Sequence, residues 1–165
     1  DRGGFLGFEL GADGAGGHHL QLPGSGSRLF EDPDSMLKMN GREVFKFATR
    51  VMVSSAEAIL AQCGRTVDEV DVYVPHQANK RIIDYATAKL RIPPERTVVN
   101  VDRYGNTSSG SIPLALQDAR DDGRLRDGSL VLMTGMGAGL TWGSALIEWT
   151  ARSPGGDRHS LRETG

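Results

Sequence analysis

The chain has 165 residues, of which 38% are hydrophobic and 24% charged, and its formal net charge is −2. This composition is typical of one globular domain with a sizeable core, and the small net charge gives no reason to expect nucleic-acid binding. No apolar run approaches the roughly 20 residues of a membrane span, and the start lacks the pattern of a signal peptide, so we expect a cytoplasmic protein without a membrane anchor.

The first half is expected to contain one strand and one long helix. A strand is predicted over 5–10, and the Gly-, Ser-, Pro- and Asp-rich stretch 11–41 is predicted to be a surface excursion. Apolar residues at helical spacing then indicate a helix that begins near Asn40 and ends at Gly64. The Thr66-x-x-Glu69 pattern is typical of a capping box on a short helical turn.

The second half is expected to alternate between strands and helices. The predicted elements are a strand over 70–74, a helix over 79–90, a strand over 98–101, a helix over 111–121, and strands over 130–133 and 140–149. Such alternation predicts an α/β layered domain with a mixed sheet, which we place in residues 1–150. The polar tail 151–165 has no pattern and is predicted to be disordered.

Three segments with chemically informative residues are each predicted to follow a strand. They are Val74-Pro75-His76-Gln77-Ala78-Asn79, Tyr104-Gly105-Asn106-Thr107-Ser108 and the glycine-rich run from Gly135 to Gly143. Ligands of α/β proteins bind where strands end, so the coincidence favours a shared site. The glycine-rich run is not a dinucleotide fingerprint, because Leu140 stands where a third glycine belongs and a strand follows instead of a helix.

Each of these residues also has a simple structural interpretation when it is taken alone. His76 could be a histidine at a strand end that bonds to nearby backbone, and Asn106 could be a turn former. Cys63 is the only cysteine, which excludes a disulfide framework, and its place in the last turn of a helix is the wrong end to activate a thiol. The pair His18-His19 has no suitably spaced ligand, so no metal site is predicted.

Taken together, the segments resemble one family. Pro75-His76-Gln77-Ala78-Asn79, Gly105-Asn106-Thr107-Ser108 and the Gly135–Gly143 run are similar, in the same order, to the C-terminal half of the β-ketoacyl-acyl-carrier-protein synthase III family. The similarity extends back through residues 39–46 to the first strand. It implies a thiolase-like fold, of which this chain would be the C-terminal α/β repeat.

The resemblance implies a condensing enzyme without a cofactor or metal. Such enzymes join an acyl group from acyl-CoA, held on a cysteine, to malonyl-acyl-carrier protein with loss of carbon dioxide. His76 and Asn106 match the catalytic histidine and asparagine, whose N–H groups would stabilise the oxygen on which negative charge develops. His76 is expected to be neutral in this role, since burial disfavours an imidazolium.

The resemblance also implies supporting roles. Gly137 and Ala138 would lie in a substrate and oxyanion loop, with Met136 where many relatives have Phe, and Asn79 would help order the site. A basic surface for the acidic carrier protein would include Arg81, Lys46 and Lys89. For these three residues the alternative is an ordinary solvated helix face.

Family members consist of two similar halves and carry the nucleophilic cysteine in the N-terminal one. The present chain is therefore expected to be inactive by itself and to form homodimers only as part of a complete enzyme. A fragment, a truncated reading frame and one piece of a split enzyme all stay open. Alternative functions are a polyketide-priming acyltransferase and a noncatalytic remnant that binds carrier protein, whereas the motif pair disfavours thiolase or HMG-CoA-synthase-like activity.

Overall fold

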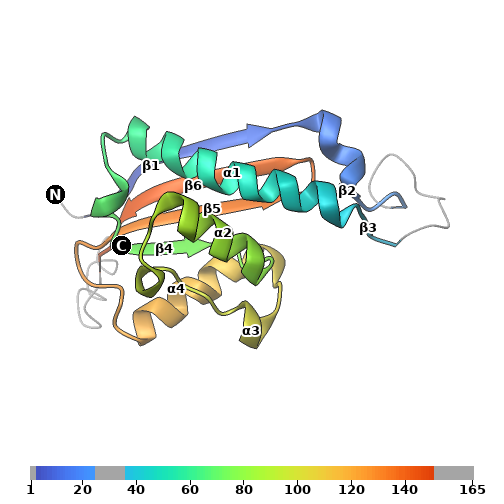
Figure 1. Cartoon of the computed structure of the whole chain (residues 1–165). Coiled ribbons are helices and arrows are strands. Elements are labelled where there is room, and N and C mark those ends of the chain that lie inside the picture. The colour runs from blue at the N-terminus through green and yellow to red at the C-terminus, as the bar shows by residue number, and fades with distance from the viewer. Residues whose placement is uncertain (1–2, 25–35, 151–165) are drawn as a thin grey trace, which may run out of the picture.

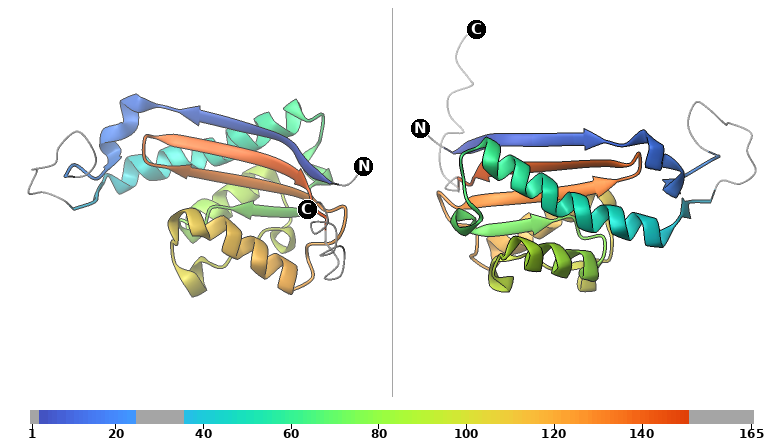
Figure 2. Two further views of the ribbon diagram at one scale, coloured as in Figure 1. Left: turned by 180° about the vertical axis from the view of Figure 1, so that it is seen from behind. Right: turned by 45° about the horizontal axis from the view of Figure 1, so that its top comes forward.

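The computed structural model describes residues 3–24 and 36–150, so the predicted tail 151–165 lies outside the described residues. Its main sheet contains, in spatial order, β1 (Gly4–Ala12), β6 (Thr141–Glu148), β5 (Leu130–Gly137) and β4 (Val72–Pro75). Helices α1 (Gly41–Gln62) and α2 (Lys80–Leu90) cover one face of this sheet (Figure 1). Helix α4 (Ser111–Asp121) packs against the other face at β4 and β5 (Figure 2).

The sheet is mixed, as the alternation of strands and helices predicted. Strands β4 and β5 are parallel, whereas β6 runs antiparallel to both β5 and β1. A parallel pair needs a crossover connection, and the segment from α2 to α4 supplies it. The α/β fold class is therefore confirmed, and the strand ends of β4 and β5 lie at the same edge of the sheet.

Helix α1 supplies the larger part of the core. It begins after Asn40, whose side chain accepts a hydrogen bond from the Glu43 N–H, and it ends before Gly64, which has a φ of +63°. Its buried face packs against the middle of the sheet. The most deeply buried side chains of this core include Met52, Ile59, Tyr73, Ile83, Leu132 and Leu146. On the opposite face α4 presents Ala115 and Ala119, which are fully buried.

The stretch between β1 and α1 is more regular than the sequence predicted. It contains a 3₁₀ helix, η1 (Gly14–His19), and a short antiparallel pair of β2 (Leu20–Gln21) and β3 (Lys38–Met39). The Asp13 carboxylate caps η1 by accepting from the Ala15 N–H. The short turn η2 (Val67–Glu69) also forms as predicted, with the Glu69 carboxylate accepting from the Thr66 N–H at 2.7 Å.

The prediction of a strand over 98–101 is wrong. Thr97 makes only an isolated parallel bridge to Tyr73, and the chain then turns into the short helix α3 (Val101–Tyr104). The physical reason lies in Gln77, whose side-chain oxygen accepts the N–H groups of Asn100 and Val101. These donors are satisfied by a side chain, so no neighbouring strand is needed.

The glycine-rich run is largely strand instead of loop. β5 extends through Gly137, and Gly135 pairs with Gly143 across the β5–β6 hairpin. A prediction that ended the strand at Met133 was therefore too short, because glycine's low strand propensity is outweighed here by antiparallel pairing. The turn itself comprises residues 138–140.

Strand β1 lies at an edge of the sheet and leaves large apolar side chains in solvent. Gly7 and Gly11 point to the α1 side of the sheet. A Cβ at Gly7 would meet Cys63 at the end of α1, and one at Gly11 would meet the Trp142 ring of β6, which packs against Phe47 of α1. Phe8 and Leu10 point to the opposite face and are 63% and 74% exposed. Helix α4 does not reach this part of the sheet (Figure 2). An apolar sheet face of this kind is typical of a buried interface.

Candidate active site

Two of the three predicted motif segments lie beside each other at the end of the parallel strands. Pro75 of β4 pairs with Thr134 of β5, and the His76 N–H donates to the Thr134 carbonyl at 2.7 Å. A Cβ added to Gly135 would lie 4.0 Å from the His76 Cβ and 3.7 Å from Ile112 of α4. The carboxyl end of β4, the middle of β5 and the first turn of α4 therefore converge at His76.

The imidazole of His76 is half-buried and has one hydrogen-bond partner. Its Nδ1 lies 2.5 Å from the Ser111 hydroxyl oxygen at the start of α4. Burial lowers the pKa of His76 below its usual value, so the ring is neutral at neutral pH. Within the described part of the chain the other nitrogen, Nε2, has no partner. It is free to face a substrate.

Asn106 lies in the exposed connection between α3 and α4, not directly after a strand as predicted. Its side-chain oxygen accepts a hydrogen bond from the Ser108 N–H at 2.9 Å, which shapes the loop. Gly105 and Ser108 both have positive φ, of 67° and 51°. The Asn106 amide nitrogen has no partner in residues 3–24 and 36–150, so both of its N–H groups can donate to a ligand.

Ser111 connects the strand end that carries His76 to the segment that follows Asn106. Besides the contact with His76, its hydroxyl oxygen accepts from the Gln77 N–H at 3.3 Å. Ser111 is 1% exposed and begins a helix only five positions after Asn106. No sequence pattern indicates this role, because a serine at the start of a helix is ordinarily explained by capping.

Gln77 is a second residue whose contribution to the site is visible only in the structure. Its carboxamide is 0% exposed and uses all its polar capacity. The nitrogen donates to the carbonyls of Pro75 and Val98 at 2.9 and 3.0 Å, and the oxygen accepts from Asn100 and Val101 at 2.8 and 3.2 Å. The available signal was a polar residue two positions after a fully buried strand.

Comparison with known proteins bears on this geometry. A family model described as "3-oxoacyl-[acyl-carrier-protein (ACP)] synthase III C terminal" matches residues 60–149. The chain belongs to the synthase III family. The matched segment contains His76, Gln77, Asn106 and Ser111, and therefore the whole arrangement described above.

Individual relatives agree with this assignment. The chain is 51% identical over 152 residues to the β-ketoacyl-[acyl-carrier-protein] synthase III of Symbiobacterium thermophilum, with 88% of this chain and 46% of the relative covered. The solved synthase III of Thermus thermophilus is 50% identical, with a TM-score of 0.80 and coverage of 88% and 46%. The solved priming β-ketosynthase of a polyketide pathway is 35% identical, with a TM-score of 0.79 and coverage of 87% and 44%. The chain thus spans less than half the length of these relatives.

The only cysteine of this synthase III chain is not placed to act with His76. Cys63 caps the C-terminus of α1 and lies beside Gly7 of β1, where an added Cβ would be 2.7 Å from its sulfur. β1 and β4 are the two outer strands of the sheet, with β6 and β5 between them. The thiol therefore lies beside one outer strand, whereas His76 follows the other.

No cluster of three metal-ligating side chains occurs among the described residues, and no described helix is long and apolar enough to cross a membrane.

The predicted basic residues lie on α1 and α2, which contact each other. Arg81 is exposed, and its guanidinium lies 5.2 Å from the centre of the Phe45 ring, with no carboxylate partner among the residues the structure describes. Lys46 differs, because it pairs with Glu43 at 2.8 Å. Lys89 lies over the Tyr85 ring. Asn79 caps α2 by accepting a hydrogen bond from the Arg81 backbone N–H at 2.9 Å.

The predicted loop residues occupy the β5–β6 hairpin. Gly137 ends β5, and Ala138 is exposed in the turn, where its carbonyl accepts from the Thr141 hydroxyl at 3.0 Å. Met136 is half-buried and packs against core clusters beneath α1. Its side chain therefore lies on the sheet face opposite to the one where Gly135 contacts Ile112.

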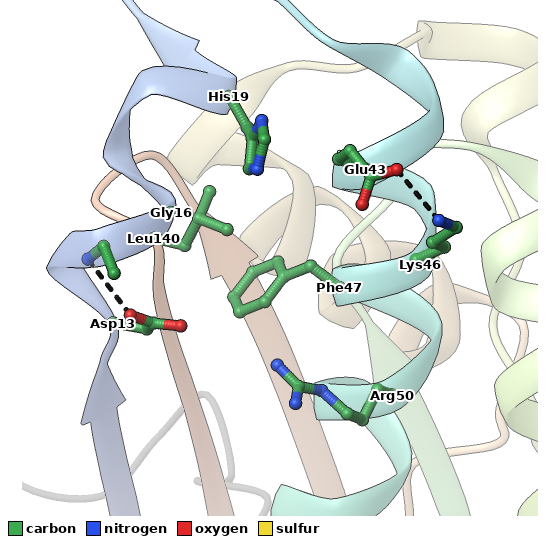
Figure 3. Close-up of a pocket in the computed structure, with 9 residues that line it drawn as sticks. Asp13, Gly16, His19, Glu43, Lys46, Phe47, Arg50 and Leu140 are labelled. Carbon is green, nitrogen blue, oxygen red and sulfur yellow. Dashed lines mark hydrogen bonds and ion pairs between the residues drawn. The ribbon is translucent and has the colours of Figure 1, made fainter.

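An open cavity of about 490 Å³ lies elsewhere, between η1 and the first turns of α1 (Figure 3). Its lining side chains are Asp13, Ala15, Gly16, His19, Glu43, Lys46, Phe47, Arg50 and Leu140. Lys46 is the only predicted site residue among them, and its charge is directed to Glu43 (Figure 3). His76 and Asn106 do not line this cavity, so it is separate from the arrangement at the strand ends.

The Gln77 hydrogen bonds generate a stability prediction. Gln77→Ala removes the partner of two buried carbonyls, one buried N–H group and one part-buried N–H group, and each buried group costs about 1–3 kcal/mol when unsatisfied. We expect the free energy of unfolding to fall by about 3 kcal/mol or more, as measured by chemical denaturation. Gln117→Ala, on the exposed side of α4, is the matched control, with an expected change within about 0.5 kcal/mol. Equal effects of the two substitutions would contradict the role assigned to Gln77.

Proposed function

We propose that this chain is the C-terminal catalytic half of a β-ketoacyl-acyl-carrier-protein synthase III, an acyltransferase of fatty acid biosynthesis. The complete enzyme would condense an acyl-CoA starter with malonyl-acyl-carrier protein and would need no cofactor or metal. One observation carries the proposal. His76 Nδ1 and the Asn106 side-chain oxygen are each held by a local hydrogen bond, whereas His76 Nε2 and the Asn106 amide nitrogen have no partner among the described residues. Each of these two nitrogens can donate to a substrate, and we infer that they share one oxygen.

The chemistry needs such donors. When the malonyl thioester loses carbon dioxide, the electron pair of the broken C–C bond moves toward the thioester carbonyl, and negative charge appears on its oxygen. Preorganised N–H donors lower the energy of this enolate more than that of the uncharged thioester. The resulting carbon nucleophile attacks the acyl thioester on the cysteine, and the cysteine sulfur leaves as thiolate. A neutral His76 suits this role, because it donates without carrying a buried charge.

The acyl-transfer oxyanion would be held by the hairpin turn. We assign this role to the backbone N–H of Ala138, with Gly137 permitting close approach. The observation in support is that Ala138 is exposed beyond the end of β5, the strand that contacts His76. Met136 is proposed to influence acyl-chain preference from beneath this turn, and Asn79 to order the N-terminus of α2, which it caps.

Two alternatives remain distinguishable from this function. One is a polyketide-priming acyltransferase, since the chain is also 35% identical to a priming ketosynthase, and profiling acyl-CoA starters in the complete enzyme separates the two. A noncatalytic carrier-protein-binding remnant would bind malonyl-acyl-carrier protein without releasing carbon dioxide. A cytoplasmic homodimer is proposed for the complete enzyme on the family resemblance alone.

Catalysis by His76 and Asn106 is tested in the complete protein. We expect His76→Ala and Asn106→Ala each to lower the rate of malonyl-acyl-carrier-protein decarboxylation by about 10²–10³-fold, because each removes one of two donors to the enolate oxygen. Release of labelled carbon dioxide measures this rate. His18→Ala, an exposed histidine of η1, should behave as wild type. Retention of wild-type rates by both site variants would reject the proposal.

The nucleophile is proposed to belong to a preceding half of the same or a partner polypeptide, without which this chain would be inactive. Two observations support this proposal: the chain spans 46% of its relative, and Phe5, Phe8 and Leu10 of β1 expose an apolar face. A similar α/β half packed on that face would remove these side chains from water, at about 25 cal/mol for each Å² buried.

The intact mass of the native polypeptide tests this proposal. We expect a mass of about twice 17.7 kDa, because the chain spans 46% of its relative. The measurement is denaturing mass spectrometry after purification with an antibody to this domain. A native mass near 17.7 kDa, without a co-purifying protein that contains the cysteine, would contradict the proposed two-half enzyme.

The carrier protein is proposed to dock on Arg81, with weaker contributions from Lys46 and Lys89. Arg81 is the best supported of the three, because its exposed guanidinium is held over Phe45 and is not neutralised by a described carboxylate. Lys46 already shares its charge with Glu43. An acidic partner is steered by uncompensated charges of this kind.

Charge reversal at Arg81 tests this surface. We expect Arg81→Glu to weaken the binding of acyl-carrier protein about tenfold at low salt, with a smaller loss at high salt because exposed charges are screened. Affinity is measured by titration of the carrier protein at two ionic strengths. Arg126→Glu makes the same charge change at an exposed position near the opposite ends of β4 and β5, and should bind as wild type. Equal affinities for the two variants would remove Arg81 from the docking surface.

A further inference from the structure

The hydroxyl of Ser111 lies between the His76 imidazole and the Gln77 backbone N–H, both of which follow the end of β4. Its oxygen lies 2.5 Å from His76 Nδ1 and 3.3 Å from the Gln77 backbone nitrogen. The serine is 1% exposed, so water does not compete for these contacts. Its backbone is held at the start of α4, a helix whose buried Ala115 and Ala119 pack it against the sheet. The hydroxyl therefore has a defined place relative to the imidazole.

The direction of the two hydrogen bonds follows from the number of protons. The Gln77 backbone N–H can only donate, so it uses one lone pair of the Ser111 oxygen. The hydroxyl has a single proton, and His76 Nδ1 is its only acceptor within the described residues. If Nδ1 carried a proton instead, the oxygen would accept twice and the buried hydroxyl proton would be left without a partner, which is unfavourable.

From this geometry we propose that Ser111 is a positioning residue that keeps the proton of neutral His76 on Nε2. The hydroxyl donates to Nδ1, and Nε2–H is thereby the nitrogen available to a substrate oxygen. The inference rests on the proposed function for its catalytic meaning, because only a donor on the open side of the ring can stabilise an enolate. Asn106, five positions before Ser111, would supply the second hydrogen-bond donor to the enolate oxygen.

The first test uses the wild-type complete protein and requires no activity. Ring-nitrogen NMR of histidine-labelled protein, with His76 assigned by comparison with His76→Gln, reports which nitrogen carries the proton. We expect a protonated Nε2 and an unprotonated Nδ1 at neutral pH. A protonated Nδ1 would overturn the inference, whatever the enzyme's reaction proves to be.

The second test separates positioning from general structure. Ser111→Ala should lower the decarboxylation rate about tenfold, the effect of one lost hydrogen bond, while loading of the acyl group from acyl-CoA stays within about twofold of wild type. Ser111→Thr, which keeps the hydroxyl, should recover most of the rate. Ser109→Ala, a neighbouring exposed serine, is the matched control.

The outcomes distinguish this inference from the proposed function. If wild-type protein does not decarboxylate the malonyl substrate, the proposed function fails and the NMR result alone decides the role of Ser111. If wild type is active and Ser111→Ala decarboxylates at the wild-type rate, the inference is wrong and the function stands. Parallel loss of acyl loading and decarboxylation in Ser111→Ala would also overturn it, since that pattern indicates general disruption.

Discussion

The buried carboxamide of Gln77 holds together the segments that form the site. A side chain with no exposure to water must satisfy each of its polar atoms internally, and Gln77 does so by joining β4 to the Val98–Val101 segment. That segment continues through α3 to Asn106. The position of Asn106 relative to His76 therefore depends on one amide group that itself takes no part in the proposed chemistry.

A second connection strengthens this arrangement. Asn100 donates from its side chain to the Asp118 carboxylate on α4 at 2.6 Å, and Arg103 pairs with the same carboxylate. Helix α4 in turn begins at Ser111, which contacts His76. The strand end, α3 and α4 thus form a closed set of hydrogen bonds around the loop that contains Asn106. Such a set restrains an otherwise exposed loop, and preorganisation of this kind is what electrostatic stabilisation of an enolate requires.

The same fold leaves one apolar sheet surface exposed to water, which is energetically unfavourable. α1 and α2 cover one face of the sheet, but α4 covers only the β4 and β5 part of the other. Phe8 and Leu10 of the edge strand are exposed as a result. A second half that covered this face would remove these side chains from water.

The sequence by itself was enough for the α/β class, the long helix α1, strand β4 and the family resemblance, because these depend on local periodicity, capping and contiguous motifs. It also identified His76 and Asn106 as the residues on which chemistry is expected to depend. Residues 98–101 were predicted as a strand because Val98, Val99 and Val101 have high strand propensity. Only the tertiary structure shows that the side chain of Gln77 accepts the N–H groups of Asn100 and Val101, which lie 23 and 24 positions further along the chain.

The tertiary structure also decided which ordinary residues matter around the site. Ser111 follows His76 by 35 positions, and nothing in the local pattern indicates that its hydroxyl meets Nδ1. Glycine at 135 was expected in a loop, yet it is a strand residue that lies beside His76 and α4. Contacts between distant segments are set by the packing of helices on the sheet, which local propensity does not contain. The sequence therefore determined which side chains could take part in chemistry, and the packing determined which polar neighbours orient those side chains by hydrogen bonds.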